Sequence, residues 1–149
     1  MSFSTLKATI ITSGIAILVS TSCHNIKDGK KLNNSTVKLI RSLGLLEQDE
    51  KIIKYYSNYV EKGAGNFFTN KRIAHYWLDR SDRSKNDTSF AFYHDIISID
   101  TVYVVPDTFS PYMTIKKSDS TEFKVYVDGN HNEIKSFFEE AINIWQAKK

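Results

Sequence analysis

The stretch Phe67-Phe68-Thr69-Asn70-Lys71-Arg72-Ile73 decides the fold of this chain. Aromatic and β-branched side chains favour extended backbone, and the five residues that follow (Ala-His-Tyr-Trp-Leu) continue the pattern, which predicts one strand over residues 67–78. Gly63 and Gly65 mark a turn over residues 61–66, just before it. Both faces of the predicted strand are partly apolar, so the alternation of side chains leaves its inner face open.

Further strands are predicted on both sides of this segment. Residues 51–60 are rich in β-branched and aromatic side chains, which favours a strand. Residues 88–105 are typical of two strands joined by a bend at Asp95 or Asp100. Residues 113–127 alternate between apolar and polar side chains, as in a hairpin with one buried face. Residues 79–87 contain no apolar side chain and predict a solvated loop.

Two helices are predicted, one near each end of the domain. Residues 131–147 place apolar side chains on one helical face, namely Ile134, Phe137, Phe138, Ala141, Ile142 and Trp145. Asn130 and Glu133 have the spacing of a capping box at the start of this helix. A shorter helix is predicted over residues 36–43, with Ser35 or Thr36 as its cap and Gly44 at its end.

Three of these segments together resemble the bacterial pleckstrin-homology-like family, which includes GRAM-type domains. They are residues 67–73, the Asp-Ile-Ile-Ser-Ile run of residues 95–99, and the helix of residues 134–145. The resemblance implies a mainly β (α+β) fold, in which antiparallel strands form a small barrel or two packed sheets capped by the C-terminal helix. It also implies a single domain over residues 35–149. The charged loop at residues 79–87 and the two prolines, Pro106 and Pro111, depart from the family's pattern.

The N-terminus resembles a bacterial lipoprotein signal. Lys7 supplies a positive charge, residues 10–19 form an apolar run too short to span a membrane, and small residues precede the single cysteine, Cys23. The resemblance implies that residues 1–22 are removed and that Cys23 carries the lipid chains, palmitate among them. Ser20 and Ser22 stand where such signals usually have Leu and a smaller residue. Ordinary cleavage near Ser22, which would leave a free thiol, is the alternative.

A lipidated Cys23 would place the protein in the cell envelope, facing the periplasm or the exterior. His24 follows the cysteine in place of the Asp that retains many lipoproteins at the inner membrane, so the outer membrane is favoured by analogy. Residues 23–34 are polar and lack periodicity, and we expect them to form a flexible tether.

Composition and motifs argue against several classes of function. After removal of residues 1–22, the chain has 127 residues and a formal charge of +2, which is too balanced to favour nucleic acid. The four histidines show no metal-binding spacing, and no nucleophile elbow or phosphate-binding glycine loop is present. We therefore expect a protein that is not an enzyme and that needs no metal or cofactor.

Two binding functions remain open. In the first, the domain engages a protein partner at the cell envelope through a sheet edge or a loop. In the second, it binds anionic lipid headgroups directly, and the candidate contact residues are Lys54, Lys62, Lys71 and Arg72. The pattern of residues 67–73 also accounts for Lys71 and Arg72 as part of the fold's own signature.

Overall fold

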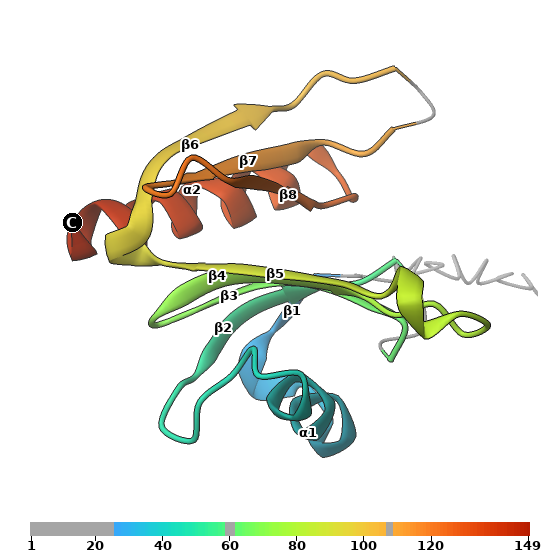
Figure 1. Cartoon of the computed structure of the whole chain (residues 1–149). Coiled ribbons are helices and arrows are strands. Elements are labelled where there is room, and N and C mark those ends of the chain that lie inside the picture. The colour runs from blue at the N-terminus through green and yellow to red at the C-terminus, as the bar shows by residue number, and fades with distance from the viewer. Residues whose placement is uncertain (1–25, 59–61, 107–108) are drawn as a thin grey trace, which may run out of the picture.

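The computed structural model describes residues 26–58, 62–106 and 109–149 (Figure 1). The strands are β1 (Ile26–Asp28), β2 (Ile52–Tyr56), β3 (Ala64–Thr69), β4 (Arg72–Trp77), β5 (Asp87–Phe92), β6 (Ile96–Val102), β7 (Tyr112–Lys117) and β8 (Glu122–Tyr126). The helices are α1 (Asn34–Ser42) and α2 (His131–Lys148), and three short 3-10 turns are η1 (Gly29–Lys31), η2 (Arg83–Lys85) and η3 (Tyr93–Asp95). Among the described helices, none is long and apolar enough to cross a membrane.

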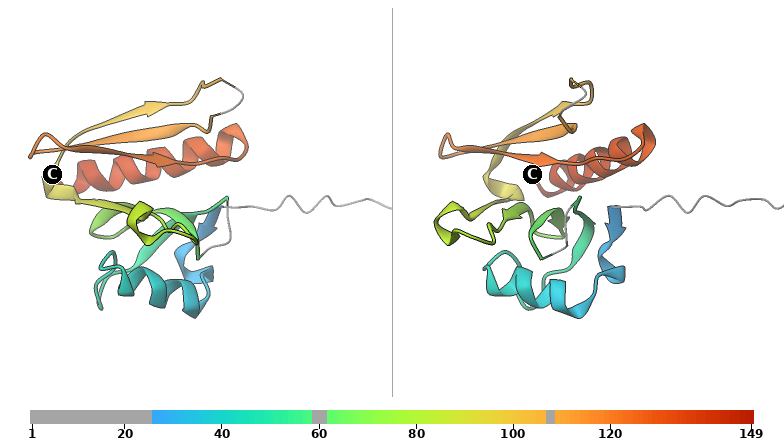
Figure 2. Two further views of the ribbon diagram at one scale, coloured as in Figure 1. Left: turned by 45° about the vertical axis from the view of Figure 1, so that its right-hand side comes forward. Right: turned by 90° about the vertical axis from the view of Figure 1, so that its right-hand side faces the viewer.

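The strands form two antiparallel sheets. Sheet A has the order β1-β2-β3-β4-β5, and sheet B has the order β6-β7-β8. The two sheets pack face to face without closing into a barrel, and α2 lies on the side of sheet A that faces sheet B, whereas α1 covers the opposite side (Figures 1 and 2). Of the two predicted arrangements, two packed sheets is therefore the correct one.

The larger apolar cluster lies between sheet A, sheet B and α2. The predicted stripe of α2 supplies Phe137 and Phe138, which are fully buried, and the ring of Phe137 packs edge-to-face on Phe68 with centroids 5.0 Å apart. The indole nitrogen of Trp145 donates to the carbonyl of Ile96 at 3.3 Å, which fixes the end of the helix against the start of sheet B. The capping box that begins α2 is present as predicted.

A smaller apolar cluster lies between sheet A and α1. Its buried members are Leu32, Ile40, Leu45, Leu46, Tyr55, Phe67, Ala74 and Tyr76. Neighbouring residues of β3 enter different clusters, because Phe67 faces α1 while Phe68 faces α2. Sheet A is covered on both faces, and this explains why the alternation in residues 67–78 did not show a single inner face.

The prediction of one strand over residues 67–78 is wrong. The segment is a hairpin, in which β3 ends at Thr69 and β4 begins at Arg72. The turn carries no glycine or proline, and it is held by side chains: the Thr69 hydroxyl accepts the backbone N–H groups of Lys71 and Arg72, both at 2.9 Å. The Asn70 side-chain oxygen also accepts the N–H of Lys51 at 2.8 Å.

The later strands follow the prediction closely. The bend predicted at Asp95 is η3, and it carries the chain from β5 in sheet A to β6 in sheet B. Strands β7 and β8 form the predicted hairpin, with Met113, Ile115, Phe123 and Val125 all facing the core. The solvated loop ends at Asn86, because Asp87 already begins β5.

Residues 26–34 are not part of a flexible tether, which the sequence predicted over residues 23–34. Ile26–Asp28 forms β1 and pairs with β2, so that Ile26 lies opposite Tyr56. Ile26 packs against the larger cluster and Leu32 belongs to the smaller one, which gives this polar segment two apolar anchors. The helix predicted over 36–43 starts earlier, because Asn33 is its cap. The predicted signal peptide and Cys23 lie outside the described residues.

Candidate functional site

Arg72, a predicted lipid contact, is only 2% exposed. Its Nε and Nη2 donate to the two carboxylate oxygens of Glu50 at 3.0 and 2.9 Å, and Nη2 also donates to Glu47 at 3.0 Å. The guanidinium lies over the rings of Phe90 and Phe92, 4.8 and 4.2 Å from their centroids. A buried cation with this bidentate pairing joins the loop before β2 to β4. It is not accessible to a lipid phosphate.

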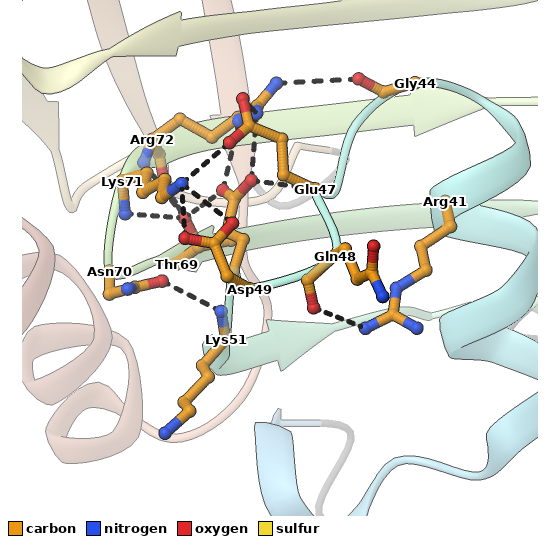
Figure 3. A network of polar contacts seen from close by, with 11 residues as sticks. Arg41, Gly44, Glu47, Gln48, Asp49, Lys51, Thr69, Asn70, Lys71 and Arg72 are labelled. Carbon is orange, nitrogen blue, oxygen red and sulfur yellow. Dashed lines mark hydrogen bonds and ion pairs between the residues drawn. The ribbon is translucent and has the colours of Figure 1, made fainter.

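Thr69 completes this buried polar network (Figure 3). Its hydroxyl donates to Glu50 while it accepts the two backbone N–H groups of the β3–β4 turn. The hydroxyl of Tyr93 donates to the Thr69 carbonyl at 2.6 Å. A buried carboxylate is stable only where several donors satisfy it, and Glu50 has such donors in Thr69 and Arg72. The network therefore serves to fix the turn and the loop together.

Lys71 lies at the surface of the same turn. Its Nζ contacts Glu47 at 2.7 Å and Asp49 at 3.0 Å. The hydrogen bond that Lys71 donates to Glu47 raises the pKa of Lys71, and the hydrogen bonds from Lys71 lower the pKa of Glu47 and of Asp49. Two carboxylates around one ammonium leave this turn with no excess of positive charge.

The other two predicted lysines lie elsewhere. The Lys54 ammonium contacts Glu140 of α2 at 2.6 Å and the hydroxyl of Ser136 at 2.9 Å. Lys62 is exposed and precedes β3, whereas Lys71 follows its far end, so these two lysines lie at opposite ends of the strand. The structure does not bring Lys54, Lys62, Lys71 and Arg72 onto one surface. Three of them are also paired with carboxylates.

A cleft of about 400 Å³ opens between the two sheets at the end where β4 and β8 finish. Its lining includes five aromatic residues, Tyr56, Tyr76, Trp77, Phe109 and Tyr126, although the ring of Tyr76 belongs to the cluster on the α1 side of sheet A. Three of these residues are well exposed, with fractions of 43% for Trp77, 66% for Phe109 and 40% for Tyr126. The backbone N–H of Tyr126 donates to the side chain of Asn66 at 3.2 Å, which joins the sheets beside the cleft.

His75 and Asp87 form the titratable part of the cleft. The His75 Nε2 lies 3.7 Å from a carboxylate oxygen of Asp87, and its ring stacks on Phe123 with centroids 5.5 Å apart. Burial lowers the pKa of His75, an effect that the charge of Asp87 opposes. Burial therefore favours the neutral form of the imidazole, and Asp87 is the acidic side chain of the pair.

Tyr56 forms part of the cleft wall and is 2% exposed. Its hydroxyl makes no hydrogen bond of ordinary geometry within the described part of the chain, although the backbone of Asp128 lies beside it. Burial, together with the charge of Asp128, raises the pKa of Tyr56 to about 12. The phenol is protonated at neutral pH and keeps a donor available.

A second hollow, a groove of about 480 Å³, follows the outer edge of β5. Residues 88–92 form one wall, and Asp95 with residues 117–119 of the β7–β8 turn forms the other. In the described chain β5 pairs on one side only, with β4. Alternate backbone N–H and C=O groups of β5 therefore point away from β4, as in any edge strand.

The sequence predicted neither hollow, because their residues lie far apart along the chain. The cleft combines side chains from β4, β5 and β8, which meet only once the order of both sheets is known. A predicted edge strand would have been the available signal for the groove, but the order of strands in a sheet cannot be read from alternation alone.

No protein-family model matches this sequence, and no curated protein matches it. Among solved structures, the chain is similar to the crystal structure of a DUF1696 family protein with a pleckstrin-homology domain from Shewanella loihica PV-4. The likeness has a TM-score of 0.50 at 16% identity, over 78% of this chain and 97% of that chain. At this identity it shows the fold alone. The chain has a pleckstrin-homology-like fold, as the resemblance of the three segments (67–73, 95–99 and 134–145) implied.

Proposed function

We propose that this protein is a lipid-anchored, non-catalytic binding domain of the cell envelope that captures an extended segment of a protein partner along β5. The observation that carries the proposal is the groove beside this edge strand, which runs along five consecutive residues. Five residues of strand extend about 17 Å, enough to pair with a five-residue segment. The fold does not by itself determine the function, so the proposal rests on this groove.

Pairing along β5 would satisfy backbone groups that no other strand of the described chain pairs with. An added segment would exchange main-chain hydrogen bonds with β5, and its side chains would alternate between the two walls of the groove. One wall offers the ring of Phe90, which is 36% exposed, and the other offers Lys117 and the carboxylates of Asp95 and Asp119. A segment that alternates apolar and polar side chains fits these walls.

The proposed anchor is a lipid on Cys23. Because β1 begins at Ile26, the chain between the lipid and the fold is short, with a reach of roughly 10 Å. The domain would stay next to the bilayer, and a partner in or beside the same membrane, for which we favour the outer membrane, would meet it at high local concentration.

The anchor is tested by intact mass and membrane fractionation of the full chain beside Cys23→Ala. We expect a mass increment of diacylglyceryl size and recovery in the membrane fraction, both lost in the variant. Cys23→Ser should behave like Cys23→Ala, since it also removes the thiol. An unmodified protein that stays out of the membrane fraction would overturn the anchor and leave the groove to be tested separately.

The groove is tested by a photocrosslinking residue at Thr88, on the β5 edge, with the same residue at Ile97, on the β6 edge, as the matched control. Ile97 is 50% exposed and Thr88 is exposed as well, so both positions are accessible. A captured protein is first identified, and its crosslinked segment is then made as a peptide. That peptide should slow hydrogen exchange at alternate amides of β5. Equal capture at both positions, or protection away from β5, would contradict the proposal.

A further inference from the structure

We propose that the cleft between the two sheets is a binding site for a small organic cation of the alkylammonium class. The proposal concerns a different surface from the β5 groove. It rests on the aromatic lining, the charge and the size of the cleft, and holds whether or not Cys23 is lipidated.

Exposed aromatic residues border the cleft. Trp77 and Phe109 come from separate parts of the chain, yet both line one hollow while they are 43% and 66% exposed. Tyr126 borders the same hollow, but its ring packs against the ring of Tyr112. Folded proteins normally bury such rings, so exposed rings that gather around one cleft mark a binding surface. The faces of aromatic rings carry negative potential and attract alkylammonium groups.

The charge of the cleft also favours a cation. Among the described residues that line the cleft there is no lysine or arginine, Asp87 is an acidic side chain, and burial favours the neutral form of His75. The site therefore carries one negative charge next to the exposed rings. It would repel phosphate, sulfate and carboxylate ligands, and it would attract a cation. A neutral ligand would gain nothing from Asp87 beyond a hydrogen bond.

The size of the cleft leaves room for more than the cationic group. A volume of about 400 Å³ lies in the lower part of the range found for small-molecule sites. A trimethylammonium group fills only part of this volume, so the cation can carry a polar substituent. Tyr56, whose buried hydroxyl makes no hydrogen bond of ordinary geometry within the described residues, forms part of the wall that such a substituent would meet.

The same cation chemistry can come from a free solute or from a lipid headgroup. Ile26 pairs with Tyr56, so the chain enters the fold beside the cleft wall. With Cys23 lipidated, the cleft would lie close to the headgroups of the membrane. This lipid source rests on the proposed anchor, whereas binding of a free cation does not.

The first experiment titrates the full-length chain, in a neutral maltoside detergent, with choline and follows tryptophan fluorescence. The matched probe is the neutral isostere of choline, in which a tert-butyl group replaces the trimethylammonium group. Trp77 lines the cleft and Trp145 is 9% exposed in the core, so Trp77→Phe should remove the signal. We expect saturation by choline in the millimolar range and no comparable response to the isostere. Equal responses would overturn the proposal.

The second experiment removes the charge. Asp87→Asn should weaken choline binding about tenfold, while Asp100→Asn, the same change at an exposed position on β6, should leave it unchanged. Circular dichroism checks that both variants fold. Should Asp87→Asn unfold, Phe109→Ala takes its place, because Phe109 is 66% exposed and contributes a ring to the cleft. Undiminished choline binding in a folded Asp87→Asn chain would contradict the proposal.

The third experiment separates the two sources. Acrylamide quenching of Trp77 is compared after addition of phosphatidylcholine or phosphatidylglycerol to the micelles, and again after addition of free choline. If phosphatidylcholine reduces the quenching of Trp77 and phosphatidylglycerol does not, the cleft binds a lipid headgroup. If free choline reduces the quenching of Trp77 and neither lipid does, the cleft binds a free cation from solution. Absence of protection by choline and by phosphatidylcholine would overturn the proposal.

Discussion

The two faces of sheet A are covered in different ways. Toward sheet B and α2, sixteen buried apolar residues form one cluster in the described chain, whereas the cluster toward α1 has eight. The face with fewer apolar contacts is also the one where Arg72 and Glu50 form a buried ion pair. A long amphipathic helix is positioned by apolar packing, while the short α1 and the loop after it rely on directed polar contacts as well. The predictions below test this difference.

Phe137→Ala should have the largest effect. It removes a ring that is fully buried and packed on Phe68, at a cost of about 3–5 kcal/mol in the free energy of unfolding. Denaturation in urea measures the change, and Ile97→Ala, at an exposed position, is the control. A loss below about 1 kcal/mol would mean that apolar packing does not position α2.

Glu50→Gln should cost about 3 kcal/mol, because it leaves the Arg72 guanidinium buried without its main counter-charge. The double variant Glu50→Leu with Arg72→Met removes both charges, and we expect it to recover most of the stability. Urea denaturation of the single and double variants measures the free energy of unfolding of each. A double variant no more stable than Glu50→Gln would show that the ion pair itself, and not the penalty of an unpaired charge, determines the result.

Gly65→Ala should cost about 2 kcal/mol through overpacking on the α1 side of sheet A. A Cβ at this position would lie 2.5 Å from an atom of Tyr76 and 2.6 Å from an atom of Tyr55. These rings cannot easily move apart, since their hydroxyls are hydrogen-bonded to each other at 2.9 Å. Thermal denaturation checks the effect, and an unchanged melting temperature would show that the rings adjust freely.

Lys71→Ala should have the smallest effect, a fall of about 2 °C or less in Tm, because exposed ion pairs contribute little. The folded state lowers the pKa of Glu47 and Asp49, so their contribution is present at neutral pH and is lost as the pH falls through these lowered values. The difference between wild type and variant should shrink from about pH 7 to about pH 3. A difference that grew with acid would contradict this.

Much of the fold could be predicted from local patterns. Helix α2 was predictable because its apolar stripe lies on one face and Asn130 with Glu133 caps it. The β7–β8 hairpin was predictable because one of its faces is buried and the other is not. Sheet A is covered on both faces, so alternation failed there, and the β3–β4 turn was missed because the Thr69 side chain, and not a glycine, holds it.

The sites were less predictable than the fold. The sequence indicated Arg72 as a surface cation, yet Glu50, more than twenty residues earlier, folds over it and excludes solvent. Asp87, by contrast, appeared as the end of a solvated loop, and only the order of the strands places it beside His75. Pairing of charges across the chain is a property of the tertiary fold, and no local pattern contains it.

The short first strand also has a mechanical consequence. β1 has three residues, lies at the edge of sheet A, and is the part of the described chain nearest to the proposed anchor. A force applied at the N-terminus would act first on the few backbone hydrogen bonds between β1 and β2, and these would break one after another. Strand β1 would therefore detach from the sheet under a pulling force at which both apolar clusters of the domain stay folded.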